Sequence, residues 1–225
     1  MADEIKINEF DNADLMFDIL GDMISREIKH ALRENKKCNV LLSGGSTPKP
    51  LYLRLGKESF KGNPNLQYGL IDERFVETND GNSNEKMIKE CLGIESDIKG
   101  MIYRLDSYQK NLELVNEAYV PFKQRTDLSI LGMGTDGHTA SIFPGDENSE
   151  LPRRSNDKEV YNTNAPISPT RRITCSKELI CDSKFIYLII TGKDKKKVLL
   201  DNERDLPIHD ILKQRPDIHI FYADK

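Results

Sequence analysis

The sequence has few cysteines and no metal-binding pattern. Its four cysteines are Cys38, Cys91, Cys175 and Cys181, and no two of them form a Cys-x-x-Cys pair. The nearest two lie six positions apart, which is not a spacing that zinc sites use. We therefore expect free thiols in a reducing compartment, and no metal site.

Long apolar segments are absent as well. The longest apolar run, residues 185–190, is far shorter than the ~20 residues that a helix needs to span a bilayer. Residues 1–10 carry Asp3, Glu4 and Lys6 and lack the apolar stretch of a signal peptide. The sequence thus predicts a cytoplasmic protein with no membrane partner.

Positive charge is not in excess. The chain has 33 basic and 37 acidic residues, and its formal net charge is -4. This balance argues against a nucleic-acid partner, which would favour a basic surface. Net charge does not describe a single cleft, so the balance is compatible with a local basic pocket for a small anion.

The chain of 225 residues does contain a regular alternation of short apolar segments and amphipathic ones. The predicted helices are residues 15–32, a segment that starts near Thr47 and Pro48, residues 83–92 with Ser83 as N-cap, residues 112–124, and a lysine-rich helix after Gly192. The predicted strands are residues 38–42, 68–71, 128–133, 185–191 and 217–222, with 101–105 as a further candidate. Residues 144–169 are predicted to form a long functional loop.

This alternation predicts an α/β fold. We expect a single domain over residues 1–225, in which a doubly wound, mostly parallel sheet carries helices on both faces. Ligands of such sheets bind beyond the carboxyl ends of the strands. Four polar clusters follow predicted strands, at residues 43–48, 72–74, 134–138 and 192–195. We therefore expect these clusters to converge on one pocket.

The first cluster, Ser43-Gly44-Gly45-Ser46-Thr47-Pro48, has the composition of a phosphate cradle. Gly44 and Gly45 let the backbone approach an anion closely, and Ser46 and Thr47 add hydroxyl donors beside a helix start. A plain strand-to-helix turn is the alternative at this point. The segment has neither the Gly-Lys-Ser/Thr of a P-loop nor a Gly-x-Gly-x-x-Gly dinucleotide turn.

The second cluster, Asp72-Glu73-Arg74, places three charges directly after an apolar strand. Such a cluster is typical of a substrate clamp or of an internal salt bridge. The guanidinium of Arg74 has the fork geometry that suits a phosphate or a sugar hydroxyl.

Two basic clusters follow later in the chain. Arg171 and Arg172 precede a short strand, and four lysines including Lys195 crowd the start of the lysine-rich helix. Helix starts usually favour acidic residues, so a lysine that faces an anionic ligand would explain this run. A solvated basic face is the alternative.

The third cluster, Gly132-Met133-Gly134-Thr135-Asp136-Gly137-His138, predicts a tight turn that ends in a histidine. We expect His138 to open a short helix over residues 139–143, whose dipole would disfavour imidazolium and leave a neutral base. Asp136 is close enough in sequence to orient the ring. The alternative is that His138 merely caps this helix. We expect the other histidines, His30, His209 and His219, to be surface or packing residues.

Taken together, these segments resemble the 6-phosphogluconolactonases. The matching stretches follow the order of the family over roughly residues 40–200, and they are highly specific only in combination. They are Ser43-Gly44-Gly45-Ser46-Thr47-Pro48, Asp72-Glu73-Arg74 with Ser83-Asn84, Gly132-Met133-Gly134-x-Asp136-Gly137-His138-Thr139-Ala140-Ser141-x-Phe143-Pro144, Arg172-Ile173-Thr174, and Thr191-Gly192-x-x-Lys195.

The resemblance implies a fold similar to that of glucosamine-6-phosphate deaminase and ribose-5-phosphate isomerase A. It implies hydrolysis of 6-phosphogluconolactone to 6-phosphogluconate in the oxidative pentose phosphate pathway. The implied partner is a small phosphorylated sugar lactone, and neither a metal nor an organic cofactor is expected.

Four differences separate this chain from its implied relatives. The related deaminases carry a catalytic Glu where this chain has Phe143, and they have Asp-Glu-Tyr where it has Asp72-Glu73-Arg74. Both differences favour the lactonases. Cys175-Ser176 replaces the usual Leu-Thr of the lactonases, and no Trp precedes the Asp-Glu-Arg strand. Neither departure falls on a proposed catalytic group.

The resulting hypothesis assigns a role to each cluster. His138 is the base that takes a proton from water, Asp136 holds its tautomer, and Arg74 or backbone N–H groups of the glycine turn stabilise the oxyanion. The expected substrate ligands are Gly44, Gly45, Ser46, Thr47, Asp72, Arg172 and Lys195. A deaminase or isomerase of the same fold and a non-catalytic sugar-phosphate-binding module are the alternatives. The sequence is compatible with a monomer or a homodimer.

Overall fold

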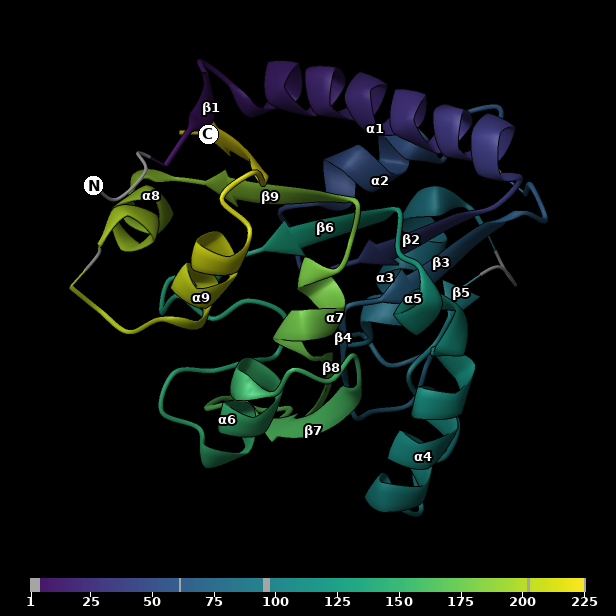
Figure 1. The fold of residues 1–225 in the computed structure, drawn as a ribbon, viewed down its shortest axis with the longest axis vertical. Helices are drawn as coiled ribbons and strands as arrows, with labels where there is room; N and C mark the ends of the chain where they lie inside the picture. Colours follow the sequence, from purple (N-terminus) through teal and green to yellow (C-terminus); the bar gives the residue numbers. More distant parts are fainter. Residues whose placement is uncertain (1–4, 61, 95–97, 202, 225) are drawn as a thin grey trace.

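A seven-stranded sheet forms the centre of the computed structural model, which describes residues 5–60, 62–94, 98–201 and 203–224 (Figure 1). The strand order is β1-β10-β9-β6-β2-β3-β5, and every neighbouring pair is parallel. The strands are β1 (Ile7–Phe10), β2 (Cys38–Leu42), β3 (Leu66–Leu70), β5 (Ile98–Lys99), β6 (Leu128–Gly132), β9 (Phe185–Thr191) and β10 (His219–Ala223). The predicted parallel α/β fold is confirmed.

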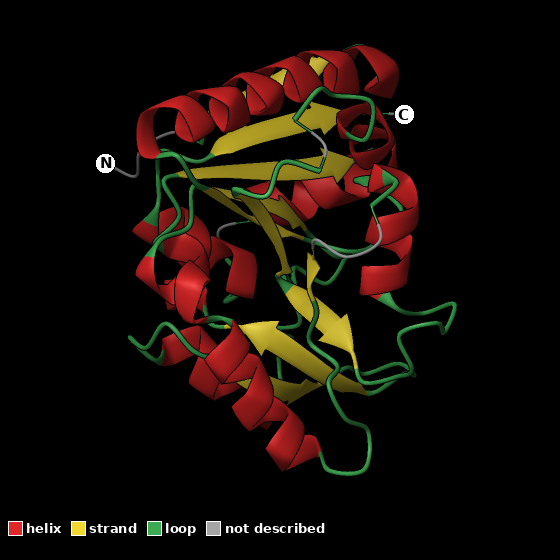
Figure 2. Cartoon of the chain, turned by 90° about the vertical axis from the view of Figure 1, so that its right-hand side faces the viewer, coloured by secondary structure: helices red, strands yellow, loops and turns green. Residues whose placement is uncertain are grey.

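Helices cover both faces of this sheet (Figures 1 and 2). In Figure 1, α1 (Ala13–Asn35) and α2 (Lys49–Leu55) lie above it, and α5 (Val120–Gln124), α7 (Lys177–Cys181) and α9 (Pro207–Gln214) lie below. The remaining helices are α3 (Asn84–Leu92), α4 (Tyr108–Ala118), α6 (Glu147–Arg154) and α8 (Lys193–Leu200). In the described chain, no helix combines the length and apolar character that a membrane span requires.

Helix α1 shows how the sequence sets these elements. The side chain of Asn12 caps its first turn by accepting a hydrogen bond from the N–H of Leu15. Lys36, with a left-handed backbone, ends it. Between these ends, Met16, Leu20, Ile24 and Ile28 follow helical spacing and are fully buried against the sheet. The buried face is the one that the sequence pattern predicts.

Of a second, smaller sheet, the sequence predicts only the short strand that follows Arg171 and Arg172. This sheet contains three antiparallel strands in the order β4-β8-β7, namely β4 (Asp72–Arg74), β8 (Arg171–Cys175) and β7 (Val160–Asn164). Residues 144–169, predicted to be one long loop, include both α6 and β7, so that prediction is wrong. Helix α6 is fixed by ion pairs of Arg153 with the distant Asp205 and Asp210, which its local sequence does not reveal.

Two further boundaries differ from the prediction. The candidate strand at 101–105 is wrong, because the side chain of Asn111 takes the N–H groups of Tyr103 and Arg104 and donates to the carbonyl of Met101. These bonds replace a strand ladder. The helix predicted at 112–124 is divided into α4 and α5 near Pro121, which has no N–H to continue a helix.

The hydroxyl of Tyr119 connects the junction of α4 and α5 to the sheet. It accepts from the N–H of Leu70 at 2.8 Å and lies 2.9 Å from the carbonyl of Leu70 and 3.1 Å from that of Lys99. We predict that Tyr119→Phe lowers the free energy of unfolding by about 1–3 kcal/mol, because buried backbone groups lose their partner.

Urea denaturation of the purified variant would measure this loss. Tyr161→Phe is the matched control, since the hydroxyl of Tyr161 makes one 3.3 Å bond to Ser155. An equal effect of both substitutions would contradict the role assigned to Tyr119.

Candidate active site

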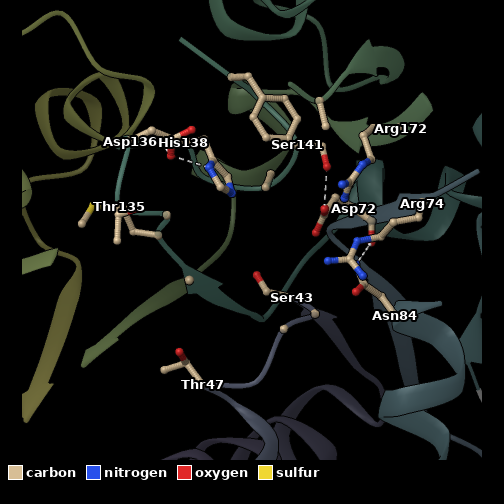
Figure 3. A pocket seen from close by; sticks show the side chains of 18 of the residues that line it. Ser43, Thr47, Asp72, Arg74, Asn84, Thr135, Asp136, His138, Ser141 and Arg172 are labelled. Atoms are coloured by element: carbon tan, nitrogen blue, oxygen red, sulfur yellow. Dashed lines mark hydrogen bonds and ion pairs between the residues drawn. The ribbon is translucent and has the colours of Figure 1, made fainter. Parts of the chain in front are cut away.

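A pocket of about 580 Å³ lies where the carboxyl ends of β2, β6 and β9 face the small sheet. The structure brings all ten residues that the sequence assigned to a site into its lining: Gly44, Gly45, Ser46, Thr47, Asp72, Arg74, Asp136, His138, Arg172 and Lys195. Figure 3 shows the Asp136–His138 pair on one side and the two arginines on the other. The four polar clusters converge, as the fold class predicts.

The imidazole of His138 is held by Asp136. Nδ1 lies 2.5 Å from Oδ1 of Asp136, and the same oxygen accepts the backbone N–H of His138 at 3.1 Å. Burial pushes the pKa of Asp136 up, but these hydrogen bonds outweigh it and hold the pKa below its usual value. The ionised carboxylate favours a proton on Nδ1, which leaves the lone pair of Nε2 available as a base.

The segment after His138 is not the predicted helix. Residues 139–142 form a tight turn with a single bridge between Thr139 and Ile142, and Ala140 has a positive φ of 53°. The hydroxyl of Thr139 donates to the carbonyl of Gly132 instead of supporting a helical turn. The helix whose dipole was expected to act on His138 is therefore absent from this segment, and the contact with Asp136 is what orients the ring.

Glycine is required at position 134 by the histidine itself. A Cβ there would lie 2.2 Å from Cε1 and 2.3 Å from Nδ1 of His138. The N–H of Gly134 also donates to the carbonyl of His138 at 2.9 Å, which closes the turn beneath the ring. Gly134 thus allows the imidazole to occupy its position in the pocket.

Backbone N–H groups line the opposite end of the pocket. In the described residues, those of Gly44, Gly45, Ser46 and Thr47 donate no hydrogen bond, and Gly45 has a φ of +90°. The side chain of Asn84 packs on Gly44, where a Cβ would lie 1.8 Å from its Oδ1. A row of free N–H groups ahead of α2 suits an anion.

Three cations face the same space. Arg74 and Arg172 are cross-strand partners in β4 and β8, and Lys195 comes from α8. No carboxylate of the described residues forms an ion pair with any of the three. Desolvation lowers the pKa of Lys195, and desolvation together with the charge of Arg74 lowers that of Arg172. A bound anion would offset both costs.

Backbone carbonyls direct the two guanidinium groups. Arg74 donates to the carbonyl of Asn82 at 2.6 Å, and Nε of Arg172 donates to that of Pro169 at 2.8 Å. Nε of Arg74 is buried and has no hydrogen-bond partner among the described residues. The adjacent Arg171 points elsewhere, over the ring of Tyr108 at 5.5 Å, so the pocket distinguishes two arginines that the sequence alone does not.

The two carboxylates of β4 make different contacts. Among the described residues neither forms the internal salt bridge that was one of the two interpretations of this cluster. Asp72 lines the pocket and accepts a hydrogen bond from Ser141 at 2.6 Å. Glu73 is fully buried away from the pocket and accepts from Ser83, Asn84 and Glu85 at the start of α3. Glu73 therefore fixes the backbone that carries Arg74 and does not belong to a substrate clamp.

Several lining residues were not assigned from the sequence. Four of them lie within the motifs given above, next to residues that were assigned to the site, and this proximity could have identified them: Ser43, Asn84, Ser141 and Phe143. Residues 165–167, between β7 and β8, carry no such signal. Across the described ranges, no three His, Cys, Asp or Glu side chains are grouped so that they could hold a metal ion.

The fold and the site together define an α/β protein with a carboxylate-supported histidine opposite an anion-binding surface. The chain matches the model of the glucosamine-6-phosphate isomerases/6-phosphogluconolactonase family over residues 11–220, and it belongs to this family.

Relatives agree with this assignment along nearly the whole chain. A 6-phosphogluconolactonase of Thermotoga maritima is 31% identical and covers 85% of this chain and 86% of its own length. One of Helicobacter pylori is 31% identical and covers 96% of both. The crystal structure of a 6-phosphogluconolactonase from Shewanella baltica superimposes with a TM-score of 0.90 at 29% identity and covers 99% of both chains.

The uncompensated charge in the pocket predicts stabilisation by a simple anion. Inorganic phosphate at ~100 times its Kd would add ~2.7 kcal/mol, which corresponds to a rise in Tm of roughly 5–10 °C for a chain of this size. Differential scanning fluorimetry would measure it, with sodium chloride at equal ionic strength as the reference.

Variants identify where the phosphate binds. Arg172→Ala and Lys195→Ala should each lose most of the shift, whereas Lys193→Ala, whose lysine pairs with Asp224, should retain it. A full shift in the first two variants would place the anion outside this pocket.

Proposed function

We propose that this protein hydrolyses 6-phosphogluconolactone to 6-phosphogluconate in the oxidative pentose phosphate pathway. Family membership and relatives of the same length that carry the name 6-phosphogluconolactonase support the reaction. The observation that carries the mechanism is the imidazole of His138, held 2.5 Å from Asp136, in a pocket whose other side carries unpaired cations.

The phosphate of the substrate binds to the backbone N–H groups of Gly44, Gly45, Ser46 and Thr47, with Arg172 and Lys195 completing its charge balance. The four N–H groups donate no hydrogen bond within the described residues, and burial lowers the pKa of Arg172 and of Lys195, a cost that a bound anion would offset; both observations support the assignment. An anchor at this distance from the reacting carbon fixes the lactone and supplies orientation. Asp72, at the pocket wall, is suited to accept a hydrogen bond from a sugar hydroxyl.

The chemical step needs one base. Nε2 of His138 takes a proton from water as the water oxygen attacks the lactone carbonyl, and Asp136 stabilises the imidazolium that forms. Arg74 or N–H groups of the glycine turn stabilise the oxyanion. When the ring C–O bond breaks, the imidazolium returns its proton to the departing oxygen, so the base is regenerated.

The neighbour of the base fits this scheme. The ring of Phe143 lies 4.7 Å from that of His138, at the position where the related deaminases carry a catalytic Glu. Hydrolysis of a reactive ester does not need that second carboxylate, whereas an isomerase does. A lactonase is therefore favoured over a deaminase.

We also propose that the chain acts as one domain, as a monomer or a homodimer, in the cytoplasm. All four cysteines are free. Burial raises the pKa of the Cys175 and Cys181 thiols, which makes them poor nucleophiles. Unreactive free thiols are suited to a reducing compartment.

The proposed base predicts a specific loss of activity. His138→Ala should lower kcat for 6-phosphogluconolactone by about 10²–10⁴-fold, and Asp136→Asn should also lower kcat because the ring loses its tautomer. Acid release from freshly prepared lactone, corrected for spontaneous opening, measures both. The control is His30→Ala, an exposed histidine on α1.

Two outcomes would contradict the proposal. Equal turnover by His138→Ala and the parent would exclude His138 as the base. Release of ammonia from glucosamine 6-phosphate, without acceleration of lactone opening, would favour the deaminase alternative.

A further inference from the structure

One buried hydroxyl of the pocket lining has no hydrogen-bond partner among the described residues. Ser43 is only 5% exposed, and its Oγ is buried without a hydrogen bond to the described residues. The other buried serine of the lining, Ser141, donates to Asp72. Buried hydroxyls almost always have a partner, so a pocket hydroxyl without one indicates a partner that the protein itself does not supply.

The backbone of Ser43 is fixed on both sides. Its N–H donates to the carbonyl of Ile130 at 3.0 Å, and its carbonyl accepts from the hydroxyl of Tyr52 at 2.7 Å. Both contacts are buried between β2 and its neighbours. Only rotation of the side chain is left, so the position of the Ser43 backbone is set by the protein itself.

The location of Ser43 indicates which group of a ligand could form a hydrogen bond with its hydroxyl. Figure 3 shows its hydroxyl between the Asp136–His138 pair and the Arg74–Arg172 pair, and Ser43 directly precedes Gly44. A ligand with its phosphate on the 44–47 backbone and its carbonyl beside His138 must pass its carbon chain over this hydroxyl. A sugar hydroxyl is the group that such a chain presents.

A nucleophilic role does not fit the geometry. Ser43 makes no hydrogen bond to His138 or to any other base of the described chain, and Nδ1 of His138 is already used by Asp136. An activated serine needs a base within about 2.6–3.2 Å. The hydroxyl is therefore suited to recognition.

We propose that Ser43 is a specificity-determining residue whose Oγ hydrogen-bonds one of the secondary hydroxyls, at C2, C3 or C4, of the lactone. The proposal rests on the lactonase function proposed above. It explains why a buried hydroxyl is kept without a partner at the centre of the pocket. A site built to bond a substrate hydroxyl rejects an analogue that lacks it.

The test compares Ser43→Ala with the parent on 6-phosphogluconolactone and on its 2-deoxy, 3-deoxy and 4-deoxy analogues. The parent enzyme should discriminate against one deoxy lactone. Ser43→Ala should lower kcat/KM for the full substrate by about tenfold, and it should process that one analogue as well as the parent enzyme does. The discrimination at that carbon then disappears, and the variant's preference between the full substrate and each of the other two analogues stays as in the parent.

Ser25→Ala is the matched control. Ser25, on α1, also has a buried Oγ without a partner, but it does not line the pocket. This variant should leave all four kcat/KM values unchanged. Thermal denaturation should show that neither variant is less stable than the parent, because each removes an unpaired buried hydroxyl.

The outcomes separate the two proposals. A parent enzyme that does not accelerate lactone opening contradicts the function. An active parent whose discrimination among the four lactones is unchanged by Ser43→Ala contradicts the role of Ser43 alone. Covalent labelling of Ser43 by substrate, seen by mass spectrometry, would also overturn it in favour of a nucleophile.

Discussion

The site depends on positive charges that form no direct ion pair with a carboxylate of the described residues. Arg74 and Arg172 are cross-strand neighbours, and the fold orients them with the carbonyls of Asn82 and Pro169. A carbonyl fixes a guanidinium without cancelling its charge, as a carboxylate would. The cost appears in the lowered pKa of Arg172, which desolvation and the charge of Arg74 produce. The pocket thereby keeps its potential for an anionic ligand.

A series of buried polar contacts connects the separate segments that line the pocket. The side chain of Asp72 accepts from Ser141, its carbonyl accepts from Asn84, and Asn84 packs on Gly44. These contacts connect the segment after His138, the small sheet and the 44–47 backbone. Breaking one link would leave a buried polar group unpaired, which is costly at low dielectric. The base and the anion-binding groups therefore keep fixed relative positions.

The sequence predicts what depends on local pattern and misses what depends on distant partners. Strands 38–42 and 185–191 agree with β2 and β9 at both ends, because buried parallel strands are continuous apolar runs. Polar clusters after such strands likewise identify the site. The turn after His138 and helix α6 were mispredicted, since their conformations rest on bonds to Gly132 and to Asp205 and Asp210. The sequence does not reveal the role of Glu73 either, because that role depends on hydrogen bonds from the start of α3.

The side chain at position 143 lies next to both kinds of group that the proposed reaction uses. Phe143 lies between the base and a cation, 4.7 Å from the ring of His138 and 5.9 Å from the guanidinium of Arg172. A carboxylate there would add a second proton carrier and would also attract Arg172, which would cancel charge meant for the substrate. An aromatic ring does neither. Because the side chain at position 143 contacts both groups, we expect a carboxylate there to change proton transfer at His138 and the charge that Arg172 offers to an anion.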